Sequence, residues 1–394
     1  MAIKRLKRNV RTGRPTRRLI SGLLLISMIG CASTPTGGGK AKGVVENEFG
    51  ERIPPDEGAL NQEIADLSVA LLKKSGGAAG KGPMTRDVHA KHHGCVRAIF
   101  AVNKDVPEEF RVGVFSGPGK EYAAWIRFSN GSPMIQDDKK KDARGMAIKL
   151  MGVEGDKVLE NEREAKTQDF VLISHDAFFV KDGKDYADFI RRIERGSNPA
   201  WFFFGRLPWR WTEFSAARQL AKRGGKIINP LFAPYFSATP YLLGGKNVVK
   251  YSARPCAENP DIKNSSSDSP DYLRLNMAKY LDAQGGKSAC FRFMVQKRVE
   301  PETMPVEDSR VPWEQLKSRF IPVATVTIPV QEFSSERQMR FCENLSFTPW
   351  HSLPAHRPLG NINRTRRQVY EAISKFRHES NHESRHEPDA AVNP

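Results

Sequence analysis

Short β-type runs separated by turn residues constrain the fold of this chain more than any other feature of its sequence. They recur between residues 95 and 180 and return near residues 290 and 321, with glycine and proline between them. Strands repeated in this way are typical of a closed barrel or a sandwich. The predicted strands are 96–100, 123–128, 145–151, 169–180, 290–296 and 321–330.

Helices are predicted around this sheet from apolar residues at helical spacing. The pattern indicates one helix over residues 57–74, another over 186–195 and a last one over 363–376. An aromatic-rich segment lies at 201–214. From residue 377 onward the sequence is polar and repetitive, which predicts a disordered tail over 377–394.

The first 30 residues are typical of an export signal. Eight basic residues and no acidic one precede the apolar run 19–30, which is too short to span a bilayer comfortably. The run ends in Met28-Ile29-Gly30-Cys31, which resembles a bacterial lipobox, so Cys31 is expected to carry the lipid and to become the new N-terminus. An uncleaved anchor and cleavage near Ala32 remain alternatives, and Arg17-Arg18 would also suit twin-arginine export.

The predicted location follows from this signal. A flexible tether over residues 31–56 would link the lipid to a domain over 57–376, held in the periplasm and at the outer rather than the inner membrane. The formal net charge is +17, and the eight basic residues of the signal account for about half of it. The remaining excess suits anionic ligands or anionic lipid, and a nucleic-acid partner is not expected.

Four cysteines remain beyond the lipobox. In an exported chain, Cys95, Cys256, Cys290 and Cys342 allow two disulfides in three connectivities. We expect a bridge between Cys256 and Cys290, whereas Cys95 could equally be a buried thiol.

Four segments carry most of the chemically active side chains. They are Arg86-Asp87-Val88-His89-Ala90-Lys91, Trp125-Ile126-Arg127-Phe128-Ser129-Asn130, Asp142-Ala143-Arg144-Gly145-Met146-Ala147-Ile148-Lys149 and Arg366-Arg367-Gln368-Val369-Tyr370. In this order and spacing they resemble the haem-binding core of the catalases, over roughly residues 84–376. The resemblance implies an α+β fold with a catalase-like antiparallel β-barrel and peripheral helices, without the C-terminal helical domain of full catalases. It also implies haem b as the cofactor.

The resemblance implies a distal side built from His89 and Ser129. His89 would take a proton from one peroxide oxygen and deliver it to the other, which suits an imidazole. Ser129 would fix the tautomer of that ring through a hydrogen bond. A histidine in a turn, or a metal cluster of His89, His92, His93 and Cys95, is the alternative.

The resemblance implies a proximal side built from Tyr370 and Arg366. Tyr370 would bind the haem iron as tyrosinate, and Arg366, one helical turn earlier, would lie on the same face and favour the phenolate. His351 and His356 are competing iron ligands. The further residues expected to bind the cofactor are Arg86 and Arg127, at the propionates, and Val88, Phe178 and Tyr186.

The sequence departs from the catalase pattern at one distal position. In the segment 169–182 the register places Ile173 where catalases have an asparagine, and Ser174 lies next to it. Ser174 is therefore the expected substitute as a catalytic hydrogen-bonding group, with His175 as the alternative. Losing one donor to a developing charge costs on the order of 10²-fold in rate. The departure argues against efficient dismutation of hydrogen peroxide.

The predicted function is a haem-dependent enzyme that consumes hydrogen peroxide or an organic hydroperoxide in the bacterial cell envelope. One alternative is a fatty-acid hydroperoxide isomerase or dehydratase that resembles the catalase-related allene oxide synthases. Another is a haem-binding envelope lipoprotein without turnover. The expected partners are peroxide and, through Cys31, the membrane. A monomer or dimer is expected rather than a catalase tetramer.

Overall fold

The computed structural model describes residues 43–75, 83–258 and 267–388. The predicted export signal, Cys31 and the first part of the tether lie outside the described residues. None of the helices in the described part of the chain is long and apolar enough to cross a membrane.

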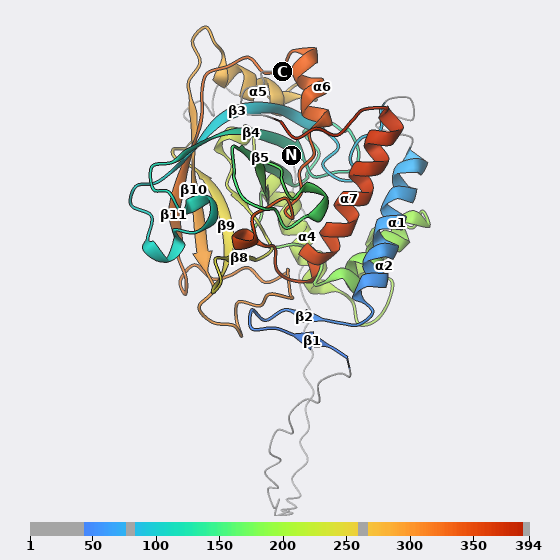
Figure 1. The fold of residues 1–394 in the computed structure, drawn as a ribbon. Coiled ribbons are helices and arrows are strands. Elements are labelled where there is room, and N and C mark those ends of the chain that lie inside the picture. Colours follow the sequence, from blue (N-terminus) through green and yellow to red (C-terminus); the bar gives the residue numbers. More distant parts are fainter. Residues whose placement is uncertain (1–42, 76–82, 259–266, 389–394) are drawn as a thin grey trace, which may run out of the picture. The chain divides into compact units, whose positions relative to one another are not determined.

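Eight antiparallel strands of the described chain close into a barrel (Figure 1). The order around the ring is β10-β11-β3-β4-β5-β6-β7-β9, and β9 pairs back with β10. The short strand β8 (Tyr241–Leu243) adds to β9. Closure leaves no barrel strand with an unpaired edge. The strands are β3 (His92–Val102), β4 (Glu121–Asn130), β5 (Arg144–Met151), β6 (Thr167–Ile173), β7 (Tyr235–Phe236), β9 (Asn247–Pro255), β10 (Ala289–Lys297) and β11 (Phe320–Ile328).

Aromatic rings fill the interior of the barrel. The ring of Phe170 lies 4.7 Å from that of Phe293 and 5.1 Å from that of Tyr251, measured between centroids. Phe100 and Phe115 pack against the same cluster and are fully buried. These side chains come from strands far apart in sequence, so the predicted β-type runs meet in one core.

All six predicted strands are present, but the fourth is shorter than predicted. β6 ends at Ile173, whereas the pattern predicted a strand to residue 180. The amide of Ser174 donates to the carbonyl of Arg144, and the Ser174 hydroxyl accepts from the Arg144 amide. The amide of Ala177 donates to Nδ1 of His175, which turns the chain away from the sheet.

Helices cover the barrel from outside. Figure 1 shows α1, α2 and α7 side by side along one flank. Ile64 and Leu72 of α1, Ala187 of α2, and Val369 and Ile373 of α7 form a buried apolar cluster that holds these helices together. The helices of the described chain are α1 (Glu57–Ser75), α2 (Gly183–Glu194), α3 (Ala200–Phe204), α4 (Trp211–Gly224), α5 (Tyr272–Leu281), α6 (Glu336–Asn344) and α7 (Asn361–Asn381).

Helix α7 is longer than the sequence predicted. It continues to Asn381, so the predicted boundary at residue 376 and the start of a disordered tail at 377 are wrong. Arg377 and His378 are buried in its last turns. Arg377 Nη1 donates to the backbone carbonyl of Glu343 over 2.6 Å, which ties the end of α7 to the end of α6.

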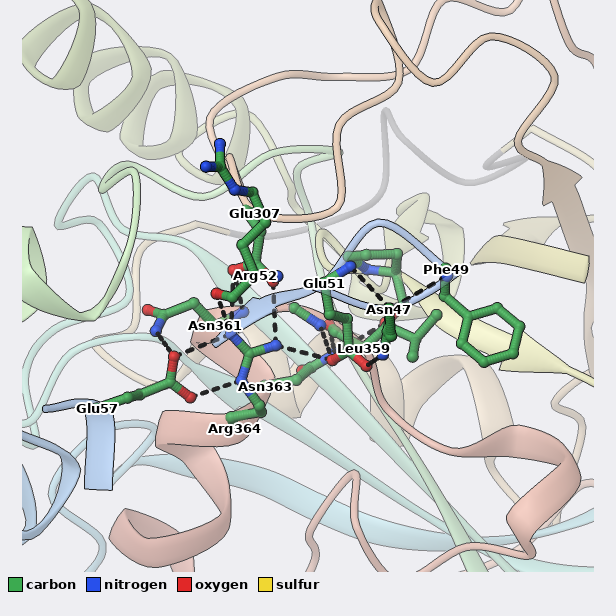
Figure 2. A network of polar contacts seen from close by, with 12 residues as sticks. Asn47, Phe49, Glu51, Arg52, Glu57, Glu307, Leu359, Asn361, Asn363 and Arg364 are labelled. Atoms are coloured by element: carbon green, nitrogen blue, oxygen red, sulfur yellow. Dashed lines mark hydrogen bonds and ion pairs between the residues drawn. The ribbon is translucent and has the colours of Figure 1, made fainter. Parts of the chain in front are cut away.

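The predicted tether is folded over its second half. β1 (Val45–Glu46) and β2 (Arg52–Ile53) form a hairpin, so a flexible segment as far as residue 56 is wrong. Glu51 in this hairpin bonds Nη1 of Arg364 at 2.8 Å. Figure 2 shows how Arg364 also reaches Glu57 and Glu307, at 2.5 Å and 3.0 Å. The guanidinium of Arg364 therefore joins the first turn of α7 to the N-terminal hairpin, to α1 and to the segment that contains Glu307.

The described part of the chain contains two disulfides. Cys256 pairs with Cys290, as predicted. Cys95 pairs with Cys342 over a sequence separation of 247 residues and is not a free thiol. The second bridge links strand β3 to helix α6.

Candidate functional site

A pocket that encloses about 670 Å³ of empty space, part of it open to solvent, is lined by residues of β4, β5, β6 and α7. Most of its wall is apolar, so a largely apolar ligand is favoured. The apolar side chains that line it are Val88, Met146, Ala147, Val171, Leu172, Phe347 and Ile373.

His89 lines this cavity in an uncommon backbone conformation. Its φ is +60°, which few residues other than glycine adopt. The surroundings hold it there: the His89 amide donates to the carbonyl of Gly131 over 3.1 Å, and its own carbonyl accepts from Arg127 Nη2 over 2.8 Å. The imidazole Nδ1 lies 3.0 Å from the hydroxyl of Ser129. This bond orients the ring and leaves Nε2 for a ligand.

Gly145 on β5 makes room for this pair. It is opposite Ser129 in the β4–β5 ladder. A Cβ on Gly145 would lie 2.6 Å from Nδ1 of His89 and 2.7 Å from the Oγ of Ser129. Neither distance is tolerable, so the His89–Ser129 contact requires glycine at this position.

The protein around His89 keeps its imidazole neutral. Removal of the ring from water, followed by the positive charges of Arg127, Arg366 and Arg86, lowers the pKa of His89 to about 3. The neutral imidazole is the form in which a histidine acts as a general base.

Three arginines meet one carboxylate at the cavity wall. Arg86 Nη1 lies 2.8 Å from Glu343 Oε1, and Arg127 Nη2 lies 3.9 Å from Glu343 Oε2. Arg377 bonds the backbone of Glu343 and also lines the cavity. Within the described residues, the buried Nε of Arg127 has no hydrogen-bond partner. The excess of positive charge and the unused donor suit an anionic ligand with carboxylates.

Tyr370 lines the cavity from helix α7. The guanidinium of Arg366, one turn earlier, lies 6.0 Å from the centre of the Tyr370 ring. Arg366 Nη1 donates to the Thr239 hydroxyl over 3.3 Å and to Asn363 Oδ1 over 3.4 Å. These bonds fix the arginine beside the phenol.

Several residues predicted for the site do not line the cavity. Ser174 is buried with its hydroxyl bonded to the amide of Arg144. Phe178 and Tyr186 lie with ring centroids 6.4 Å apart, and Tyr186 packs in the helical cluster behind Tyr370. Val88, Arg86 and Arg127 do line the cavity.

The distal asparagine has no replacement at the cavity. Ile173 pairs with Gly145 and with Phe236 in the sheet and does not line the cavity. Among the described side chains that line it, none is asparagine or glutamine. The cavity thus offers no side-chain amide to a bound ligand.

The competing metal-binding interpretations find little support in the described chain. Cys95 is in a disulfide, and His93 Nε2 bonds Asn130 at 3.1 Å. His356 is buried between the Tyr251 hydroxyl and the Val114 amide. Neither His351 nor His356 lines the cavity.

One cluster of potential metal ligands does occur among the described residues. It contains His351, Glu162 and Glu387. Lys149 Nζ already lies 2.6 Å from Glu387, and Arg385 pairs with Glu162. The carboxylates are therefore neutralised by cations, and the cluster is a charge network.

Sequence analysis missed three residues that shape the site. Arg377 follows Tyr370 by seven residues, two turns on the same helical face, and would have been found had α7 been predicted at its full length. Gly145 lay inside a recognised motif, and neither it nor Glu343 was given a role. No local pattern showed that Glu343 would meet arginines more than 200 residues away in the sequence.

The residues that line the cavity suit haem in polarity and charge. A largely apolar cavity receives an imidazole and a phenol from different elements. Arg86, Arg127 and Arg377 outnumber the two acidic side chains beside them, Asp87 and Glu343, which suits an apolar ligand with carboxylates.

Comparisons with known proteins point to catalases. The family model described as catalase matches residues 83–203, which include His89 and Ser129 but not Tyr370. A catalase of Ascaris suum is 31% identical over 131 residues, 31% of this chain and 22% of that protein. A catalase of Latilactobacillus sakei is 32% identical over 131 residues, 31% of this chain and 25% of that protein. The matched segment therefore spans about a quarter or less of these relatives.

Solved catalases have the same fold. A fungal catalase superimposes with a TM-score of 0.60 and 18% identity, over 76% of this chain and 60% of that chain. Catalase A of Saccharomyces cerevisiae gives a TM-score of 0.60 and 18% identity, over 76% of this chain and 62% of that chain. The predicted α+β fold with a catalase-like barrel is confirmed.

Proposed function

We propose that this catalase-related chain is a haem-dependent enzyme that decomposes peroxide. The observation that carries the proposal is that His89, oriented by Ser129, lines the same cavity as Tyr370. An acid–base group and an iron ligand are the two side chains that peroxide cleavage at haem uses, and a tyrosinate is one such iron ligand.

The cofactor proposed for this cavity is haem b. Tyr370 would hold the iron, and Arg366 would favour the phenolate through its charge. Arg86, Arg127 and Arg377 would bind the propionates. Haem, when bound, supplies the redox-active iron at which the O–O bond of a peroxide is cleaved.

His89 would move the proton that this cleavage needs. Its Nε2 accepts a proton from one oxygen of the peroxide and returns it to the departing oxygen, so that water or an alcohol leaves in place of an anion. Ser129, at Nδ1, would hold the tautomer that leaves Nε2 free to accept. The apolar wall would limit the water that competes for the same positions.

We further propose that the protein works in the bacterial cell envelope. The support is the lipobox-like sequence that ends at Cys31, after a basic and then an apolar segment. A lipid on Cys31 would hold the domain in the periplasm, at the outer membrane. We propose no nucleic-acid partner, and a monomer or dimer as the working state.

The absorption spectrum tests the proximal assignment. The haem-loaded protein should show a high-spin ferric tyrosinate spectrum, and Tyr370→Phe should abolish it. Tyr186→Phe is a matched control, because Tyr186 packs behind Tyr370 without lining the cavity. A tyrosinate spectrum that survives Tyr370→Phe would overturn the assignment.

A second candidate is the rearrangement of fatty-acid hydroperoxides. The lack of a side-chain amide among the lining residues, together with the apolar wall, favours an organic hydroperoxide over hydrogen peroxide. Oxygen evolution separates the two. Oxygen released from hydrogen peroxide supports the catalase-like reaction, whereas loss of a fatty-acid hydroperoxide without oxygen supports rearrangement. Haem binding without either reaction would support the remaining alternative, a haem-binding envelope lipoprotein without turnover.

A further inference from the structure

A cluster of large aromatic and aliphatic side chains is exposed on helices α3 and α4 and on the turn between them. Trp201 is 58% exposed, Trp209 48% and Trp211 57%. Leu207, in the turn, is 77% exposed. We call these four residues the tryptophan surface. Scattered exposed apolar residues are normal, but a contiguous group of this kind marks an interaction site.

Two rings of this surface, Trp209 and Trp211, pack against each other. Their ring centroids lie 5.7 Å apart, and that of Phe204 lies 5.2 Å from that of Trp211. The neighbouring Phe202 and Phe203 are buried. Trp209 and Trp211 are therefore preorganised, and binding through them requires little further loss of side-chain freedom.

The same segment is strongly basic. Residues 196–227 contain six lysines and arginines and a single acidic residue, Glu213. Glu213 is buried and bonded to Arg310. Within the described chain, the exposed side chains of Arg206, Arg218 and Lys222 form no ion pair. Their charges are free to attract an anionic surface.

We propose that the tryptophan surface docks onto an anionic phospholipid bilayer. Tryptophan prefers the headgroup level of a bilayer, where its ring is apolar and its N–H meets water. Lysine and arginine beside it are attracted to anionic headgroups. This combination of exposed tryptophan and unpaired basic side chains is what an interfacial segment presents.

The charge argues against a second copy of this chain as the occupant. A two-fold interface places the same patch on both sides. It would bring the unpaired cations Arg206, Arg218 and Lys222 of one copy against those of the other, because Arg210 and Arg223 already pair with aspartates of their own chain. Like charges repel across such an interface, whereas anionic headgroups neutralise them.

Lipidation at Cys31, as we propose, would make even weak docking effective. A tethered domain meets the bilayer at high local concentration, so the tryptophan surface would set orientation more than affinity. The docking itself needs neither the lipid nor a cofactor. It can therefore be measured on the full chain carrying Cys31→Ser, and it can fail without affecting the peroxide hypothesis.

Tryptophan fluorescence reports this surface selectively. The three exposed tryptophans of the described chain all belong to it. The buried ones are Trp125, Trp313 and Trp350. Vesicles of phosphatidylglycerol and phosphatidylcholine with brominated acyl chains should therefore quench the Cys31→Ser protein and shift its emission to the blue. Pure phosphatidylcholine vesicles should do so much less, and added salt should weaken the effect.

Two variants make the test specific. Trp201→Ser, Trp209→Ser and Trp211→Ser together should lower vesicle affinity by about tenfold or more, since partitioning scales with buried apolar area. If that variant loses its far-UV circular dichroism, the charge reversal Arg206→Glu, Arg218→Glu and Lys222→Glu takes its place and should weaken binding to anionic vesicles alone. Any binding through residues 1–42 is common to all variants.

Leu316 offers a matched control. It is 98% exposed and lies outside the tryptophan surface, so Leu316→Ser should leave vesicle binding unchanged. Unquenched tryptophans, or equal affinity of the substituted and parent proteins, would overturn the proposal. A dimer that the tryptophan substitutions dissociate, without any change in vesicle binding, would assign the surface to a second copy.

Discussion

His89 Nδ1 and the hydroxyl of Ser129 lie 3.0 Å apart, so the histidine enters the cavity with one nitrogen already engaged. Ser129→Ala should lower kcat by about tenfold with little change in KM, because it removes an orienting bond from a general acid–base worth about 10²–10⁴-fold. Peroxide consumption by the haem-loaded protein measures this. Ser374→Ala is the control, since Ser374 lines the cavity but bonds Ser346 instead. Equal losses in both variants would argue against the orienting role.

Gly145→Ala should abolish most of the activity, although it adds only one methyl group. The new methyl would meet Nδ1 of His89 at 2.6 Å, and the imidazole would have to move. We expect a loss of activity of about 10²-fold, in line with misplaced catalytic groups. Gly58→Ala tests the general effect of the substitution. Nothing lies within 4 Å of a Cβ at Gly58 in helix α1, so that change should stabilise by about 0.5–1 kcal/mol.

Arg364→Ala should be strongly destabilising. It would leave Glu51, Glu57 and Glu307 facing one another without their shared cation (Figure 2). Removing one partner of a buried ion network costs about 3–5 kcal/mol. Urea unfolding measures the change. Lys317→Ala, which removes an exposed pair with Glu300, should have a much smaller effect on the free energy of unfolding. Similar costs for both would show that the three carboxylates are solvated.

Stability should fall as the solution is acidified below neutrality. Burial lowers the pKa of His93 and of His356 to about 3, from an ordinary value of 6.5. The unfolded chain therefore binds more protons than the folded one between pH 6.5 and 3, and the free energy of unfolding drops as pH falls through that window. Burial raises the pKa of Asp87 to about 6, which acts in the opposite direction.

Urea unfolding at pH 7, 5.5 and 4.5 measures the balance. Each buried histidine contributes up to about 1.4 kcal/mol per pH unit. Two or more of them should outweigh the single aspartate. A free energy of unfolding that is constant or rises toward pH 4.5 would contradict the burial of these histidines in neutral form.

Elements with a strong local pattern could be predicted from the sequence. The alternating runs at 123–128 and 145–151 lie within strands β4 and β5, and the apolar spacing over 57–74 matches α1. Prediction failed where a short turn or a partner remote in sequence decides the structure. β6 stops at Ile173, and the turn after it is held by the bond from the Ala177 amide to Nδ1 of His175. The β-type run predicted over 169–180 continues past this turn, so its pattern does not mark the end of the strand.

The site divides in the same way. His89, Ser129 and Tyr370 lie in motifs that sequence alone could place near a cofactor. Arg377 lies in a polar stretch, and its burial follows from its bond to the backbone of Glu343. The helix predicted to end at residue 376 did not include Arg377. Likewise, the pairing of Cys95 with Cys342 is a long-range event that the four cysteines alone left open.

The long sequence separation between Cys95 and Cys342 also bears on when the cavity can form during synthesis of the chain. The cavity walls come from residues 86–172 and 346–377. The cavity therefore cannot form until residues 346–377 have been synthesised and have folded against the first part of the wall. Such high contact order makes folding slow. During synthesis the pocket has no second wall until α7 has emerged, and cofactor capture has to follow completion of the chain. A chain that is exported unfolded, as the proposed export signal would allow, would therefore have to acquire the proposed haem after export.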